Sequence, residues 1–219
     1  MAVKNLMSSL KPILPQCIQG QLQTSASSSK SCILDFDDDV KRWVVIGICL
    51  NSVLTPALRK YVTPIVDQMY KSLVKQYHID NQQFQNYLKK HPPTNTMLNY
   101  EPINDNKKLY GRQRWKYDYN VKNPVDLSKL FLQTHMAEYV AFDEACDSSA
   151  LLAIIINMDQ FPLAVQEDAI KVRTAIRNCW AHCNVIQWDI AKFCVSFQLL
   201  ESFFLKFAFK CNRRKPSYR

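Results

Sequence analysis

The chain has 219 residues, 47% of them hydrophobic, and is therefore long enough to bury one sizeable core. Its three glycines, and the lack of a GxGxxG or P-loop motif, argue against a turn-rich β fold and against a glycine-rich nucleotide loop. The formal net charge of +9 agrees with an anionic partner, such as nucleic acid, an acidic protein or a membrane surface.

The cysteines and the N-terminal residues bear on the cellular compartment. No CxxC pair occurs among the eight cysteines, and the first 30 residues lack the continuous apolar segment of a secretory signal. We therefore expect reduced thiols in the cytosol or nucleus, with a cytoplasmic location favoured.

Residues 1–34 are predicted to be a flexible leader. They include Pro12, Pro15 and a polar, serine-rich run, so little in them can pack. Lysines and serines without any acidic residue are also typical of a mitochondrial transit peptide, whereas the absence of arginine argues against one. The sequence does not decide between the two interpretations.

An acidic cluster precedes the first predicted helix, which covers 40–78. Acidic side chains at a helix N-terminus complement the helix dipole, so we interpret the cluster as a helix start rather than a metal site. Pro56 predicts a break or kink in this helix, and Pro64 a second, weaker one. The cluster consists of Asp35, Asp37, Asp38 and Asp39.

The apolar run that begins at Trp43 is a candidate membrane segment that we reject. It is too short for a membrane span and is interrupted by the polar Asn51, so we expect a core helix. A shorter helix is predicted at 81–90, ending where a His-Pro-Pro sequence begins.

A long loop rich in proline and asparagine is predicted at 91–125. Its basic residues alternate with aromatic ones, a composition that can stack on bases and contact phosphates. The alternative is an ordered surface loop that Trp115 and Tyr117 anchor to the core. The basic residues are Lys107, Lys108, Arg112, Arg114 and Lys116.

The rest of the chain is predicted to be helical. Asp126 is placed to cap one helix, and Asp147 is placed to cap a very apolar helix that should lie at the centre of the core. A motif-bearing helix and a long amphipathic helix follow, and the basic end of the chain is expected to fray. The predicted segments are 126–136, 147–161, 162–184 and 188–210, with a tail at 211–219.

The helix that starts near Pro162 carries residues suited to phosphate chemistry. Asn178 and His182 are four residues apart and share one face of a helix. Arg177 is five residues before His182, so its long side chain must bring the guanidinium to the imidazole. A guanidinium grips phosphate oxygens bidentately, and an imidazole can move a proton near neutral pH.

Other interpretations of the same segment are weaker. Cys179, His182 and Cys183 suggest zinc, but no second pair of ligands is near them in the sequence. A Cys-His nucleophile lacks a third, orienting group. An Arg and a His near the end of a helix also interact favourably with its terminal carbonyls. We expect neither a metal nor another cofactor.

The segment RNCWAH at 177–182 resembles the Arg-x4–6-His motif of the HEPN superfamily (higher eukaryote and prokaryote nucleotide-binding domains). The apolar helix before it and the long helix after it also resemble the HEPN domain of the DAZ-interacting zinc-finger ubiquitin ligases and a family of animal open-reading-frame proteins. The second family further resembles this chain at Asp39 and Trp43, at Trp115, and at the Pro-x-Asp element ending at Asp126. The similarity is firmest over 145–208.

The resemblance implies a helical bundle that pairs into dimers, with two Arg-His motifs in one composite cleft. Active members cut RNA without a metal, through attack of the ribose 2′-hydroxyl on the adjacent phosphate. On this chain His182 would be the general acid or base, Arg177 would stabilise the transition state, and Asn178 would orient the phosphate or the imidazole. Other members are non-catalytic binding or dimerisation modules.

We therefore predict an all-α, HEPN-like bundle of about five to seven helices over 35–210. The predicted function is single-stranded RNA binding, with metal-independent cleavage by a homodimer or with a HEPN-containing partner. The alternative is a non-catalytic interaction module. No membrane span is expected. The predicted catalytic residues are Arg177, Asn178 and His182, and the predicted RNA-binding residues are Arg173, Lys107, Lys108, Arg112, Arg114 and Lys116.

Overall fold

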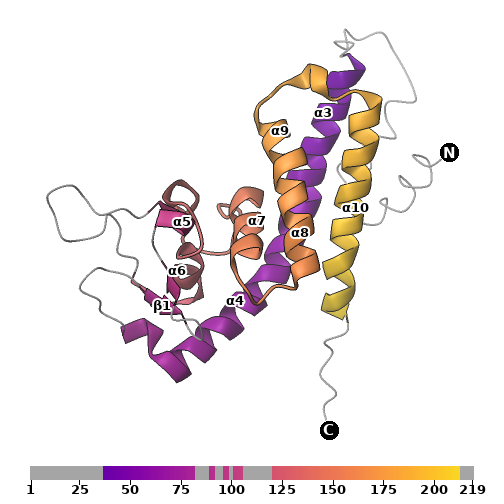
Figure 1. The fold of residues 1–219 in the computed structure, drawn as a ribbon. Helices are drawn as coiled ribbons and strands as arrows, with labels where there is room; N and C mark the ends of the chain where they lie inside the picture. Colours follow the sequence, from indigo (N-terminus) through magenta and orange to yellow (C-terminus); the bar gives the residue numbers. More distant parts are fainter. Residues whose placement is uncertain (1–36, 82–88, 92–95, 99–100, 106–119, 213–219) are drawn as a thin grey trace, which may run out of the picture.

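The computed structural model describes residues 37–81, 89–91, 96–98, 101–105 and 120–212. These residues form an all-α bundle, as predicted (Figure 1). The α-helices are α3 (Asp38–Ile48), α4 (Thr55–Tyr77), α5 (Glu101–Asn104), α6 (Pro124–Lys129), α7 (Ser148–Asn157), α8 (Leu163–Lys171), α9 (Cys179–Ala181) and α10 (Ile190–Asn212). Two π-helical segments, η1 (Cys49–Leu54) and η4 (Val172–Asn178), continue α3 and α8, and 3-10 turns lie at Ile79–Asn81, Thr134–Met136 and Val185–Gln187.

Helix α7 lies at the centre of the bundle, where its apolar sequence predicted it. It is buried from Ser148 to Ile155 and packs against α4 and α8. Asp147 begins the helix by accepting a hydrogen bond from the backbone N–H of Ala150 at 2.9 Å, which confirms its predicted role as the N-cap.

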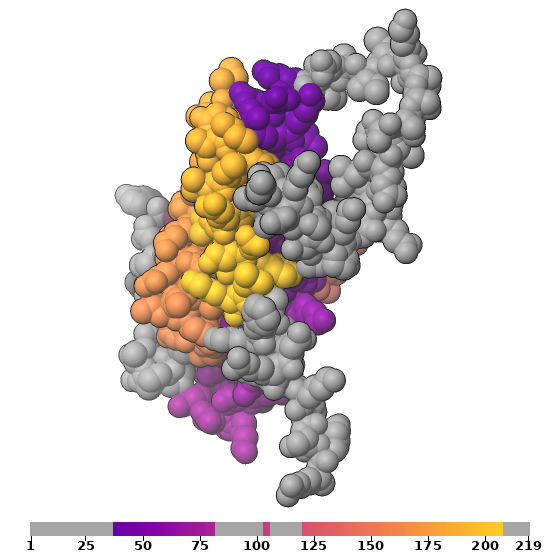
Figure 2. All heavy atoms as spheres, turned by 90° about the vertical axis from the view of Figure 1, so that its right-hand side faces the viewer, coloured from indigo at the N-terminus to yellow at the C-terminus, as the bar shows by residue number. Residues whose placement is uncertain are grey.

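Helix α10 packs beside α3 and α8 along one side of the bundle. Figure 2 shows α10 (yellow) in the middle of one face, between the α8 and η4 segments (orange) and α3 (indigo). Its buried aromatic residues, Phe203 and Phe207, join the core, and Lys206 pairs with Asp168 of α8 at 2.5 Å. The helix runs from Ile190 to Asn212, close to its predicted span.

Of the break or kink predicted at Pro56, the break is wrong, because the helix continues through this residue after the π-helical segment η1. Pro64 likewise lies inside α4. The threonine before each proline donates its hydroxyl to a carbonyl of the preceding turn. Thr55 Oγ1 donates to the Leu50 carbonyl at 2.6 Å, and the residue before Pro64 donates in the same way.

Two smaller predictions are also wrong. Asn123, rather than Asp126, caps α6: its side-chain oxygen accepts a hydrogen bond from the Asp126 N–H at 2.9 Å, and the helix ends at Lys129. The C-terminal end of the helix predicted at 81–90 is instead β1 (Lys89–His91), which pairs antiparallel with β2 (Thr96–Leu98). Strand preference depends on such cross-strand pairing, which the helical pattern of one segment does not include.

Several predictions fall on residues outside the described ranges. They are the leader at 1–34, the intervening part of the 81–90 helix, most of the loop at 91–125 with Trp115 and Tyr117, and the tail from 213 onward. Within the ranges that the structure describes, no helix has both the length and the apolar character needed to cross a membrane.

Candidate phosphate-binding site

The motif residues lie where the motif helix changes its hydrogen-bond pattern and then ends. Arg177 and Asn178 are the last residues of η4, whose π-helical form the sequence did not predict. His182 closes α9, and its backbone N–H donates to the Asn178 carbonyl at 3.1 Å. Cys183 then takes the left-handed conformation, with φ of 55°, and turns the chain away from the helix. Single π-helical turns are rare and occur frequently at functional sites.

Arg177 and Asn178 are in contact with each other. Arg177 Nη1 donates to Asn178 Oδ1 at 3.3 Å, and Arg177 Nη2 lies 3.7 Å from Asp147 Oδ2. The arginine side chain is 29% exposed, whereas the aspartate is 55% exposed. The pair is therefore long and solvated, which makes it weak and easily exchanged for another anion.

Arg173 lies one turn before Arg177 on the same segment and is close enough to feel its charge. Burial of the Arg173 guanidinium lowers its pKa, and the neighbouring positive charge of Arg177 lowers it further. Its Nη2 points to the sulfur of Met136 at 3.9 Å, which is a weak acceptor. The predicted RNA-binding residue Arg173 thus belongs to the same region as the motif.

His182 is exposed at the end of the helix. Among the residues that the structure describes, its imidazole makes no hydrogen bond or ion pair, and none links it to Arg177 or Asn178. A single chain thus brings Arg177 and Asn178 together and leaves His182 open to solvent or to another molecule.

A tryptophan pair holds the motif end against the first helix. Trp180 Nε1 donates to the Trp43 carbonyl at 3.2 Å, and Trp43 Nε1 donates to the Trp180 carbonyl at 3.1 Å. The two rings stack with their centroids 5.5 Å apart. Gly47 makes room for this arrangement, because a Cβ there would lie 2.7 Å from Trp180 Nε1. The position of His182 is therefore set by a residue on α3.

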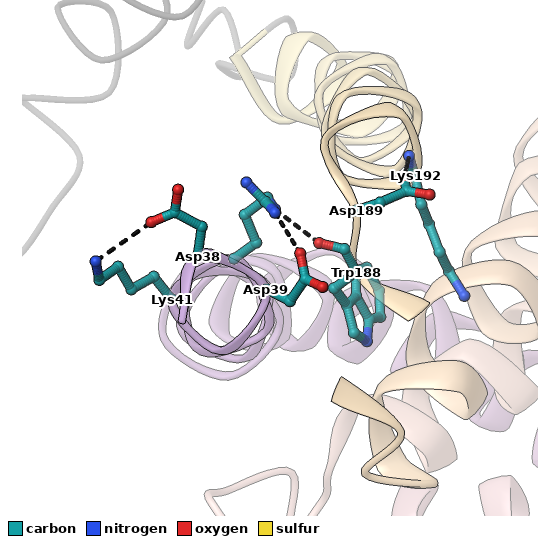
Figure 3. A network of polar contacts seen from close by, with 7 residues as sticks. Asp38, Asp39, Lys41, Trp188, Asp189 and Lys192 are labelled. Carbon is teal, nitrogen blue, oxygen red and sulfur yellow. Dashed lines mark hydrogen bonds and ion pairs between the residues drawn. The ribbon is translucent and has the colours of Figure 1, made fainter. Parts of the chain in front are cut away.

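A second contact joins α3 to the start of α10 (Figure 3). Arg42 Nε donates to the Trp188 carbonyl at 2.7 Å, and the same guanidinium pairs with Asp39. The ammonium of Lys192 lies 4.9 Å from the centre of the buried Trp188 ring. Of the acidic cluster, Asp38 and Asp39 occupy the first turn of α3, which agrees with a helix-start role.

The cysteines that the structure describes differ in burial. The described residues contain no group of three His, Cys, Asp or Glu side chains placed to hold a metal ion. Burial raises the pKa of the Cys49 thiol to about 11 and that of Cys146 to about 12, so both stay protonated at neutral pH. The exposed Cys183 donates weakly to the Ala181 carbonyl at 3.6 Å.

Comparisons with known proteins give no evidence about the family or the function of this chain. No family model, curated protein or solved structure matches this chain. The resemblance to the HEPN superfamily therefore stays a prediction. Of the predicted RNA-binding residues, only Arg173 lies in the described ranges; Lys107, Lys108, Arg112, Arg114 and Lys116 lie outside them.

Proposed function

We propose that this chain is a HEPN-like, cytoplasmic RNA-binding protein that cleaves single-stranded RNA without a metal. The observation that carries the proposal is the arrangement of Arg177 and His182. The guanidinium is half-buried beside a weak carboxylate partner, while the imidazole at the end of the same helical segment has no partner within the part of the chain that the structure describes. A phosphate can replace Asp147 on Arg177, and the free imidazole remains available for proton transfer.

The reaction requires two imidazoles, which a homodimer or a HEPN-containing partner supplies. The ribose 2′-hydroxyl oxygen attacks phosphorus while one imidazole takes its proton. The P–O5′ bond breaks, and the other imidazole protonates the departing oxygen. The products are a 2′,3′-cyclic phosphate and a 5′-hydroxyl. Arg177 stabilises the added negative charge in the transition state, and Asn178 holds the arginine in place.

A second candidate function, a non-catalytic interaction module, is favoured by exposed apolar side chains after the motif. Ile186 is 84% exposed, Ile190 59% and Val195 64%. These residues follow His182 through the connecting turn and onto α10, the helix at the centre of the face in Figure 2. Large apolar side chains in solvent are typical of protein contacts when they gather in one patch.

The experiment that separates the two functions uses labelled single-stranded RNA in EDTA. Wild-type protein and His182→Ala are incubated with the RNA, and the product ends are identified. His78→Asn is the matched control, because His78 is also exposed but lies at the C-terminal end of α4, in a left-handed conformation that asparagine adopts readily. Cleavage to cyclic phosphate by the wild type and the control, with loss in His182→Ala, supports the nuclease.

The other outcomes count against the proposal in different ways. RNA binding without cleavage by a folded dimer rejects the catalytic role of His182 and keeps the binding function. No RNA binding by wild-type protein rejects the RNA function and favours the interaction module. In that case Val195→Asp should abolish self-association or partner binding while the protein still folds.

A further inference from the structure

The carbonyl of Trp180 joins α3 to the turn that carries His182. It lies in the last turn of the motif helix, where carbonyl groups lack a partner within the helix. It accepts two hydrogen bonds at 3.1 Å, one from the backbone N–H of Cys183 and one from Trp43 Nε1 of α3. The first of these bonds closes the turn at residues 180–183, which we call the motif turn. The second ties the same oxygen to α3.

The backbone of His182 is fixed on both sides within the motif turn. Its own N–H donates to the Asn178 carbonyl at 3.1 Å, and the next N–H, that of Cys183, is the one that binds Trp180. Cys183 has the left-handed conformation that ends the helix. Within the described ranges, no hydrogen bond or ion pair holds the imidazole itself. The place of the imidazole therefore depends on the motif turn.

Helix α3 holds both the ring and the carbonyl of Trp180. The Trp43 ring stacks on the Trp180 ring at an angle of 17° between the planes. Gly47, one helical turn after Trp43, leaves the space that the Trp180 ring fills, since a Cβ there would lie 2.7 Å from Nε1. The residue two positions before His182 thus has little freedom to move relative to α3.

Trp188 shows how an indole held by packing looks in the same protein. It is 0% exposed, and its Nε1 has no hydrogen-bond partner among the residues that the structure describes. Trp43 and Trp180 are only partly buried, yet each donates its N–H to a backbone carbonyl of the other's helix. A partly buried N–H can also bond to water, so burial does not account for these two hydrogen bonds. They fix the end of the motif helix on α3.

We infer that Trp43 is a positioning residue for the reaction proposed above, because its indole N–H holds the motif turn and so places the His182 imidazole. The inference rests on the proposed function for the chemistry that His182 performs. A general acid or base must lie within hydrogen-bond reach of the proton that it moves. A displacement of about 1 Å can lower the rate about a hundredfold. Trp43 acts through the Trp180 carbonyl and not through contact with RNA.

The test uses the full-length chain and the variant Trp43→Phe, which keeps an aromatic ring for the stack and removes the N–H donor. Lys206→Gln is the matched control. It also removes one contact, the 2.5 Å ion pair with Asp168, but in the C-terminal half of α10, whereas the motif precedes the N-terminal end of that helix. Urea denaturation measures stability, amide hydrogen exchange measures the order of the motif turn, and cleavage of labelled single-stranded RNA in EDTA gives kcat and KM.

Trp43→Phe should accelerate hydrogen exchange at the Cys183 amide, because α3 no longer holds the carbonyl that this amide binds. It should lower kcat about ten- to a hundredfold and leave KM within about twofold, the pattern expected when only the transition state loses stabilisation. Lys206→Gln should keep the kcat and the Cys183 exchange rate of wild type although it is less stable. A role in stability alone would lower kcat in neither folded variant.

One measurement needs no variant. In wild-type protein the indole N–H of Trp43 should exchange slowly with solvent, because it is bound to a carbonyl. Rapid exchange of this proton would overturn the inference even if Trp43→Phe did not fold.

The remaining outcomes separate this inference from the proposed function. If wild-type protein cleaves RNA and Trp43→Phe has the same kcat, the inference is overturned and the nuclease stands. If Lys206→Gln loses as much kcat as Trp43→Phe, the loss follows stability and the inference is again overturned. If wild-type protein cleaves no RNA, the proposed function fails and the catalytic consequence fails with it. Faster Cys183 exchange in Trp43→Phe would then still support Trp43 as the residue that holds the motif turn, and unchanged exchange would overturn that as well.

Discussion

Gly47→Ala tests whether the tryptophan pair is as tightly packed as its geometry indicates. A Cβ at residue 47 would lie 2.7 Å from Trp180 Nε1 and 2.8 Å from two ring carbons. The indole cannot retreat freely, because it stacks on Trp43 and donates to the Trp43 carbonyl. The added methyl group must therefore displace either the ring or the helix that carries it.

Two effects of opposite sign decide the result. Replacing glycine by alanine inside a helix stabilises it by about 0.5–1 kcal/mol. Overpacking a filled site costs about 1–3 kcal/mol. Displacing the indole also weakens a hydrogen bond of about 0.5–1.5 kcal/mol and an aromatic contact of similar size. Because these losses overlap, we expect Gly47→Ala to lower the free energy of unfolding by about 1–3 kcal/mol.

Urea denaturation of four proteins measures the effect: wild type, Gly47→Ala, Trp180→Ala and the double variant. Once the indole is gone, Gly47→Ala should stabilise the protein by about 0.5–1 kcal/mol, because only the helix preference remains. If Gly47→Ala alone is as stable as wild type, or more stable, the close contact does not exist in solution and the reasoning fails.

Three further predictions concern other parts of the bundle. At pH 8.5, iodoacetamide should label Cys183 within minutes and should leave Cys49 and Cys146 unlabelled until urea unfolds the chain. Mass spectrometry of peptides measures the labelling. Rapid labelling of Cys146 in the folded chain would contradict its burial. Because burial raises the pKa of these two thiols above the ordinary 9.0, the folded chain holds their protons longer, and stability should fall as the pH rises from about 9 towards 11. Lys206→Gln should lower the free energy of unfolding, measured by urea denaturation, by about 1–2 kcal/mol. The reason is that the carboxylate of Asp168, which is 8% exposed, keeps only its longer ion pair with Lys171. An unchanged urea midpoint would show that the 2.5 Å pair between Lys206 and Asp168 contributes nothing to stability.

Local signals in the sequence predicted the helices well. Asp147, followed by two serines and a run of apolar residues, was enough to place the start and the burial of α7. The cap of α6 was missed although a signal was present: Pro124 prefers the first helical position, which makes the preceding Asn123 the cap. Pro56 misled because it directly follows the π-helical segment η1 and lies in the first turn of α4, and no local signal in the sequence predicted that segment.

The site was predicted only as far as one helix reaches. Arg177 and Asn178 are neighbours in the sequence, and their contact follows from that. Trp43 meets Trp180 across 137 residues, and Arg59 meets Cys146 across 87, so no local spacing reveals either pairing. Contacts of this kind depend on how the whole bundle packs.

The tryptophan pair also determines how this protein can be divided. Each indole completes the hydrogen bonding of the other's helix, so the end of the motif helix is built partly from α3. A fragment limited to 145–208 would contain the motif and both flanking helices, yet Trp180 would lose its stacking partner and Trp188 its arginine. Minimal fragments that retain an ordered motif must therefore begin at or before Asp38, the start of the helix that carries Trp43.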